Sequence, residues 1–283
     1  MSMKNHASHF LRHLLLALAG CALLAGCSSS HTLKGNKEEG LKLARLLRDQ
    51  GRQEAAAEVY ARLDVRGKLN GTEMLEYATV AGPVRQPAEA LTLYSRARDA
   101  LGGHLDEMSA PQATAICVGM GRAQLALGRT AAAQQDFDCA LRRDARNATA
   151  LNGMGVLLDA QGRHDEARRR FEQVLSIEPG NIAVMNNLAL SWLASGQSEN
   201  AINQLRRADL NNPSVRLNLA LAWLYQGNED NARNVLSQMA DASRVDALIT
   251  HLGARVARLK SGNASETLLM ASTQPLALSD NTP

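Results

Sequence analysis

The sequence predicts an all-α protein in the form of a solenoid of about six helical pairs, with a capping helix at its C-terminal end. Two observations favour helices. Aromatic residues make up only 3% of the 283 residues, fewer than β-sandwiches or barrels usually contain. The good helix formers Ala, Leu, Arg, Gln and Glu dominate the composition. The third observation is a fixed repeat period, which predicts stacked similar units.

Composition and charge narrow the function classes. Hydrophobic residues make up 45% and charged residues 21%, as in a globular protein. The formal net charge is +3, and Lys4 and Arg12 near the N-terminus supply two of those charges. Basic residues do not cluster, so nucleic acid is not predicted as a partner. No nucleophile motif, phosphate loop or metal-ligand spacing occurs, so we predict neither an enzyme nor a cofactor, metal or small-molecule site. His164 is predicted to be a solvated turn residue.

The N-terminal residues predict a targeting segment. Lys4 and Arg12 precede a twelve-residue apolar run, 14–25, which suits a signal peptide and is too short to span a bilayer. The run ends Leu24-Ala25-Gly26-Cys27, which resembles a bacterial lipobox. This predicts a signal peptide at 1–26, lipidation of Cys27 and a flexible tether at 27–36. Ser28, rather than Asp, after the cysteine resembles lipoproteins sent to the outer membrane.

Two alternatives remain for this segment. Cleavage at the second match, Leu18-Ala19-Gly20-Cys21, would leave an apolar run of only six residues, below the usual range. The other alternative is an ordinary signal peptide with a buried Cys27.

The body of the chain repeats with a period of 34 residues. Glycines recur at this spacing, and one more follows after 31 residues, at Gly128, Gly162, Gly196 and Gly227. Alanines keep the same rhythm at Ala133, Ala167, Ala201 and Ala232. The pattern resembles the tetratricopeptide repeat, a helix–turn–helix unit of 34 residues. The resemblance implies antiparallel helices A and B in each unit, a right-handed superhelix, and a left-handed glycine closing most A helices.

The repeat register divides the chain into predicted segments. Repeats one and two occupy 37–104, and repeats three to six occupy 114–243, as units 37–70, 71–104, 114–147, 148–181, 182–212 and 213–243. A connecting loop at 105–113 is predicted to be a flexion point, and the second unit departs most because it lacks the turn glycine. Ser243 is predicted to cap a helix at 244–260 that covers the end of the solenoid. The polar stretch 261–283 is predicted to be a disordered tail.

Cys117 and Cys139 both fall in the third unit. One lies near the start of helix A and the other near the end of helix B, and these ends are adjacent in an antiparallel pair. In an oxidising compartment this predicts a disulfide. The alternative is two buried free thiols.

The concave face, lined by A helices, is the predicted partner-binding groove. Its asparagines could hold a peptide backbone, and its leucines form an apolar strip suited to an amphipathic helix. The alternative is that the capping helix buries some of these leucines. The pattern lacks the run of Lys and Arg that would clamp a C-terminal carboxylate. The register also places Asp159 on this face. The groove residues are Asn152, Val156, Asn186, Asn187, Leu190, Leu193, Leu217, Asn218, Leu221 and Leu224.

One family combines these features. The lipobox occurs with Gly162-Arg163-His164-Asp165-Glu166-Ala167, Asn186-Asn187-Leu188-Ala189-Leu190-Ser191 and Leu217-Asn218-Leu219-Ala220-Leu221-Ala222. Together they resemble the TadD family, tetratricopeptide lipoproteins of the tight-adherence (Flp) pilus assembly system. The resemblance implies a pilotin-like protein on the periplasmic side of the outer membrane that binds the secretin subunit. The alternatives are a type IVa pilus pilotin and an adaptor for cell-wall hydrolases.

Overall fold

The computed structural model describes residues 36–67 and 69–261. The predictions for the signal peptide at 1–26, for Cys27, for the tether before Asn36 and for the tail beyond Ser261 fall outside these residues. Within the described part the structure is all-helical, as predicted. None of the helices described there is both long and apolar enough to cross a membrane.

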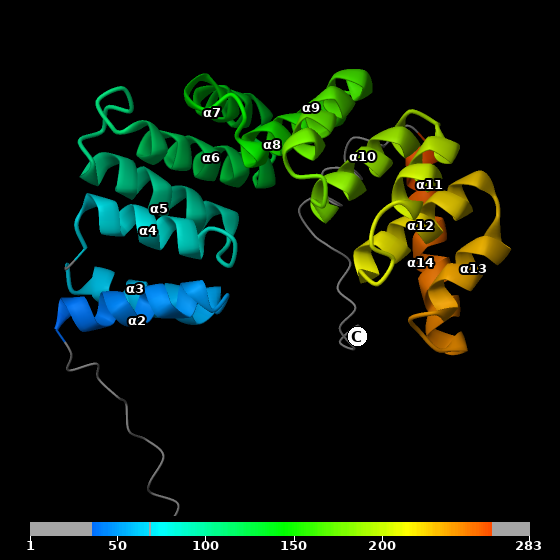
Figure 1. The fold of residues 1–283 in the computed structure, drawn as a ribbon, viewed down its shortest axis with the longest axis horizontal. Helices are drawn as coiled ribbons and strands as arrows, with labels where there is room; N and C mark the ends of the chain where they lie inside the picture. Colours follow the sequence, from blue (N-terminus) through cyan, green and yellow to red (C-terminus); the bar gives the residue numbers. More distant parts are fainter. Residues whose placement is uncertain (1–35, 68, 262–283) are drawn as a thin grey trace, which may run out of the picture.

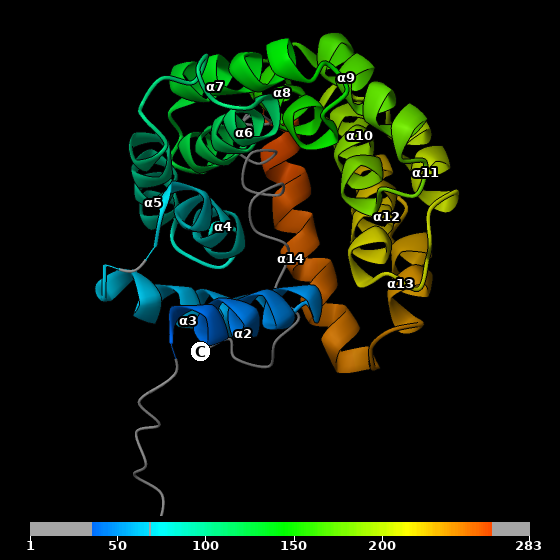
Figure 2. The same cartoon turned by 60° about the vertical axis from the view of Figure 1, so that its left-hand side comes forward.

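Twelve of the described helices form six antiparallel pairs that stack into a curved arc (Figure 1). A thirteenth, α14 (Ala242–Lys260), packs on the last pair and runs along the inside of the arc (Figure 2). The pairs are α2 (Lys37–Asp49) with α3 (Gln53–Val65), α4 (Gly71–Ala81) with α5 (Pro87–Ala100), α6 (Ala110–Ala126) with α7 (Thr130–Arg143), α8 (Ala148–Ala160) with α9 (His164–Ile177), α10 (Ile182–Ala194) with α11 (Ser198–Arg206), and α12 (Pro213–Gln226) with α13 (Glu229–Ser237).

Local signals explain where the helices begin and end. Asparagine side chains accept a hydrogen bond from a backbone N–H in the first turn of five A helices, which satisfies one of the free donors there. These caps are Asn36, Asn70, Asn147, Asn181 and Asn212. The predicted turn glycines have a left-handed backbone, with φ between 71° and 86° at Gly128, Gly162, Gly196 and Gly227.

Two boundaries differ from the sequence prediction. α6 begins at Ala110, so the last four residues of the predicted loop 105–113 are helical; Pro111 stands in the first turn, where its missing N–H costs nothing. α14 begins at Ala242 rather than at residue 244, because Asp241 and not Ser243 is its N-cap. The Ser243 hydroxyl instead donates to the Asp241 carboxylate at 2.9 Å.

Large rings from the B helices pack over glycines of the A helices. Phe137 lies against Gly121 of its own unit and Gly153 of the next, and Phe171 lies against Gly155. Tyr94 of α5 packs in the same way over Gly119 of α6, across the junction whose loop, 105–113, is predicted to be a flexion point. The second and third units are therefore joined by a buried contact. These helical positions are glycines because a ring occupies the space that a side chain would fill.

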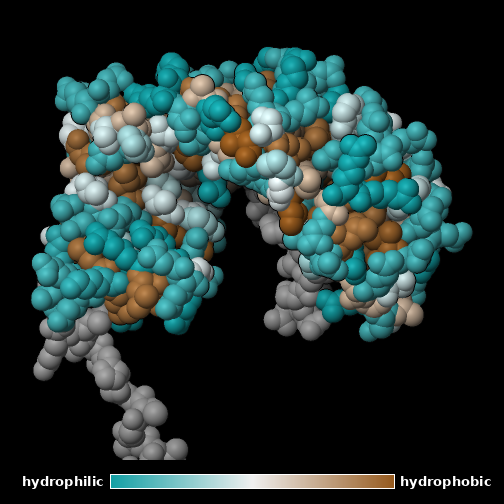
Figure 3. Space-filling model, viewed as in Figure 1, coloured by the Kyte–Doolittle hydropathy of each residue, from teal (hydrophilic) through white to brown (hydrophobic). Residues whose placement is uncertain are grey.

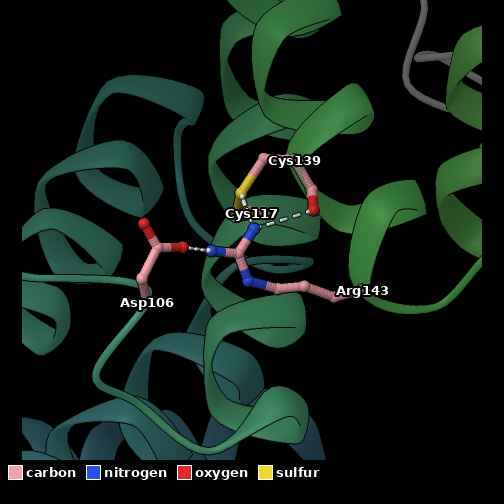
Figure 4. Close-up of a disulfide and its surroundings, with 4 residues drawn as sticks. All are labelled: Asp106, Cys117, Cys139 and Arg143. Atoms are coloured by element: carbon pink, nitrogen blue, oxygen red, sulfur yellow. Dashed lines mark hydrogen bonds and ion pairs between the residues drawn. A yellow bond between two sulfur atoms is a disulfide. The ribbon is translucent and has the colours of Figure 1, made fainter.

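The structure joins Cys117 of α6 to Cys139 of α7, with their Cα atoms 5.9 Å apart (Figure 4). Arg143 donates to the Cys139 carbonyl oxygen at 3.1 Å and to its sulfur at 3.2 Å. The same guanidinium pairs with Asp106 of the connecting loop at 2.6 Å. The disulfide joins α6 to α7 within the third unit, and the Arg143–Asp106 ion pair joins the connecting loop to α7.

Candidate protein-binding groove

A cavity of about 960 Å³ follows the inner face of the arc. Its walls come from the α4–α5 turn, from α5 to α8, from α10 and α12, and from α14 at one end. The space-filling view shows the molecule hollowed between the side formed by α2 to α5 and the side formed by α10 to α14 (Figure 3). A cavity that crosses five consecutive units is elongated, which favours an extended segment of another chain over a compact small molecule. We call it the groove.

Seven of the ten predicted residues line this groove: Asn152, Val156, Asn186, Asn187, Leu190, Leu217 and Asn218. The other three do not. Leu193 and Leu221 are fully buried in the core, and Leu224 packs against that core beside α14. Residues three apart on a helix are offset by about 60° around its axis, so Leu193 lies beside Leu190 but is turned into the core and does not line the groove. The predicted apolar strip is therefore largely core, as the alternative interpretation held.

The groove asparagines are partly used between helices. The Asn187 amide donates to Asn152 Oδ1 at 2.9 Å and links α10 to α8. The Asn186 amide donates to the Ser214 hydroxyl at 2.8 Å and links α10 to α12. Asn186 Oδ1 is buried and has no hydrogen-bond partner among the described residues. These bonds hold the amides in place and leave one buried acceptor, Asn186 Oδ1, without a partner.

The charged residues of the groove are mostly arginines. Arg85 is paired with Glu58 and Glu89. Arg122 is exposed, and Glu178, the only acid among the lining residues, accepts a hydrogen bond from the Asn181 side chain at 2.7 Å.

Arg255 of α14 is a further arginine in the groove. Like Arg122, it has no ion pair among the described residues. It is 9% exposed, and no carboxylate or hydrogen-bond acceptor pairs with its side chain in the described structure. Burial, together with the charge of Arg258, lowers the pKa of Arg255. The repeat pattern does not predict this residue, because α14 lies outside the repeat register.

Behind the groove, a buried polar cluster ties the fourth unit to the fifth. Asp159, predicted to face the groove, is instead 3% exposed, and its carboxylate accepts a hydrogen bond from Ser191 Oγ at 2.8 Å. His164 Nδ1 lies 2.8 Å from the same carboxylate, so this histidine is a partly buried partner of Asp159 rather than a solvated turn residue. Burial raises the pKa of Asp159, against the hydrogen bonds that it accepts.

This cluster does not have the order that nucleophilic catalysis requires. The carboxylate lies between the serine and the histidine, whereas a catalytic serine donates to the histidine. Ser191 is also fully buried. Elsewhere in the described residues, His, Cys, Asp and Glu side chains do not gather in threes as a metal site would need.

Comparison with known proteins identifies the repeats. Family models described as tetratricopeptide repeat match residues 118–182 and 158–214. The cellulose synthase operon protein C of Komagataeibacter xylinus is 29% identical over 159 residues, which are 51% of this chain and 12% of that protein. The uncharacterized protein y4yS of Sinorhizobium fredii is 38% identical over 78 residues, 28% of this chain and 43% of that protein. The chain thus spans less than half the length of these relatives.

Solved structures share the fold. A tetratricopeptide repeat protein from Parabacteroides merdae superposes with a TM-score of 0.57 at 18% identity, over 87% of this chain and 96% of that one. The Cut9–Hcn1 hetero-tetramer of the APC/C gives 0.59 at 14% identity, over 75% of this chain and 42% of that one. Identities this low show a common solenoid and carry no shared partner.

Proposed function

We propose that this chain, which is a tetratricopeptide-repeat protein and hence a protein-interaction scaffold, is a lipid-anchored periplasmic pilotin of the Flp (tight-adherence) pilus system. In this role it binds the secretin subunit and supports its localisation or assembly at the outer membrane. The observation that carries the binding half of the proposal is the continuous groove along the inner face of the arc. The anchoring half rests on the lipobox at Leu24–Cys27.

The groove suits a peptide segment. Asn152, Asn187 and Asn218 line it on three successive A helices. Primary amides offer both donors and acceptors, which is what the backbone of an extended peptide requires. The Asn187–Asn152 bond orients two of these amides before any partner arrives, and such preorganisation lowers the cost of binding.

A lipid at Cys27 would place this groove near the membrane. The first described helix begins at Lys37, ten residues after the cysteine. Several acyl chains give firm anchoring where one alone is marginal. Confinement at the membrane raises the effective concentration of the scaffold for a subunit that must assemble there.

The test is fractionation of the secretin multimer from cells with and without this protein. We expect the rings to disappear from the outer membrane, or to accumulate in the inner membrane, when the protein is absent. Normal rings in the outer membrane would overturn the proposal. A murein hydrolase recovered as the crosslinked partner would favour the adaptor alternative instead.

Two variants separate anchoring from binding. Cys27→Ser is expected to abolish uptake of labelled fatty acid and to release the protein from the membrane. Asn218→Trp would fill the groove with a large side chain at a position that makes no hydrogen bond of its own among the described residues. The matched control is Gln135→Trp, an equal change on the exposed face of α7. Secretin assembly is expected to fail with the first Trp variant and to persist with the second.

A further inference from the structure

Arg255 is unusual among the charged residues of this structure. It is 9% exposed, lines the groove and has neither an ion pair nor a hydrogen-bond partner among the described residues. Arg168, the other buried arginine, makes bonds to Asp165, to the Ser191 carbonyl and to Ser195 Oγ, and stacks on Trp192. A largely buried charge without a partner is costly, and a guanidinium stays protonated near neutral pH. The Arg255 nitrogens are not among the fully buried unpartnered atoms, so the guanidinium is accessible from the groove. Folding therefore leaves a charge that a ligand could satisfy.

The surroundings of Arg255 favour one class of ligand. Asn186 Oδ1, also without a hydrogen-bond partner, lies in the same groove. A peptide can supply the missing partner of Arg255, because an acidic side chain pairs with the guanidinium, while its backbone exchanges hydrogen bonds with the primary amides that line the groove. Arg85 is already neutralised by Glu58 and Glu89, and Glu178 is the only acid in the lining. The remaining charge of the groove is positive, which complements an acidic segment.

We propose that Arg255, supplied by the capping helix, is the specificity residue of the groove and pairs with an Asp or Glu side chain of an extended partner peptide. The inference rests on the groove being a peptide site, as proposed above, but it does not require that the peptide belongs to the secretin. Arg and carboxylate can pair through two parallel hydrogen bonds, which fixes position as well as charge. The capping helix would then set the register of the peptide along the A helices.

The test uses the full mature chain with Cys27→Ser and a phage-displayed library of random dodecapeptides. We expect peptides selected on this protein to be enriched in Asp or Glu at one position. The enrichment is expected to vanish with Arg255→Gln and to persist with Arg258→Gln, which removes an equal charge from an exposed position one turn along α14. Selection without acidic enrichment, or enrichment unaffected by Arg255→Gln, would overturn the proposal.

Affinity and stability then give independent readouts. For a labelled copy of the strongest peptide, we expect Arg255→Gln to weaken binding by about tenfold or more. Replacing the peptide's acid with its amide is expected to cost as much, and the two changes together no more than either alone. The melting temperature of Arg255→Gln without peptide should be equal to or above that of the parent chain, because an unpaired buried charge is lost. A lower melting temperature would mark Arg255 as a structural residue and refute the proposal.

The chain carries one competing occupant. Its residues 262–283 contain Glu266 and Asp280 and no Lys or Arg, and they begin seven residues after Arg255. The combined variant Glu266→Gln with Asp280→Asn tests this within the full chain. If acidic enrichment appears only in that variant, the tail holds Arg255 and the partner proposal is wrong. Unchanged enrichment supports it. Failure of the secretin experiment would leave either peptide result standing, so the two proposals fail separately.

Discussion

Gly119→Ala puts the packing between the second and third units to a direct test. Glycine inside a helix is normally a cost, and alanine should improve α6 by about 1 kcal/mol. A Cβ built on Gly119, however, would lie closer than 3.0 Å to three atoms of the Tyr94 ring. Tyr94 is only 6% exposed and belongs to the buried core that the helices of the first two units share with Ile116 of α6. It cannot swing into solvent without opening the junction.

The overlap should outweigh the gain in helix propensity. Overpacking a core typically costs about 1–3 kcal/mol of unfolding free energy. Because the added Cβ would overlap three ring atoms, we expect a cost at the upper end of that range, from which the gain in helix propensity is subtracted. We therefore expect Gly119→Ala to destabilise the chain by about 2 kcal/mol, measured by urea unfolding followed by circular dichroism. The matched control is Gly253→Ala in α14, where an added Cβ would meet nothing within 4 Å. That change should stabilise the protein by about 0.5–1 kcal/mol.

A second substitution isolates the ring as the cause. Tyr94→Leu removes the atoms that the new Cβ would meet. The double variant with Gly119→Ala should therefore lose less free energy of unfolding than the two single variants lose together. If Gly119→Ala alone is as stable as the parent chain, the ring does not pack over this glycine. The junction would then be the flexion point that the sequence suggested.

Three further predictions follow from buried groups. Cys117 and Cys139 are 22 residues apart, and loop entropy alone assigns such a crosslink about 3 kcal/mol, so reductant or Cys139→Ser should lower the urea midpoint. Burial, opposed by the charge of Arg98, raises the pKa of Asp136 to about 6; the cost of ionising it is complete above that pH and disappears towards pH 4. Asp136→Asn should therefore stabilise the protein at pH 7 and flatten stability between pH 4 and 7. Leu221→Glu would bury a charge at a fully enclosed position and should cost about 4 kcal/mol or more with loss of helicity, whereas retained helicity would return Leu221 to the groove.

The sequence predicted those features that repeat. Gly128, Gly162 and Gly196 end their A helices in the left-handed conformation because only the local backbone decides it. Ala133 and Ala167 are fully buried because each unit packs in the same way. Where a feature is local and recurs in every unit, one sequence shows the same residue type at the same position several times, and this repetition makes the feature predictable.

The features that the sequence did not predict depend on neighbours that break the repeat. Leu193 and Leu221 have the composition of a binding strip, yet they are fully buried in the C-terminal core on which α14 packs. The sequence predicts Asp159 and His164 at the surface. They meet across the α8–α9 turn of one unit, and Asp159 is buried there because Ser191 of the next unit covers its carboxylate. No periodicity encodes which unit ends the stack, so contacts made by the last helix are visible only in the folded chain.

The capping helix consequently has a structural role and a proposed binding role that deletion cannot separate. Leu252 and Val256 of α14 bury the apolar end of the solenoid, while Arg255, between them in sequence, lines the groove. Residues three apart on a helix lie within one turn, so the same turn serves the core with two side chains and the groove with a third. Removing α14 would expose the core and abolish binding for a trivial reason. Only a change at Arg255 that preserves melting can show whether the end of the solenoid, and not merely its repeats, selects the partner.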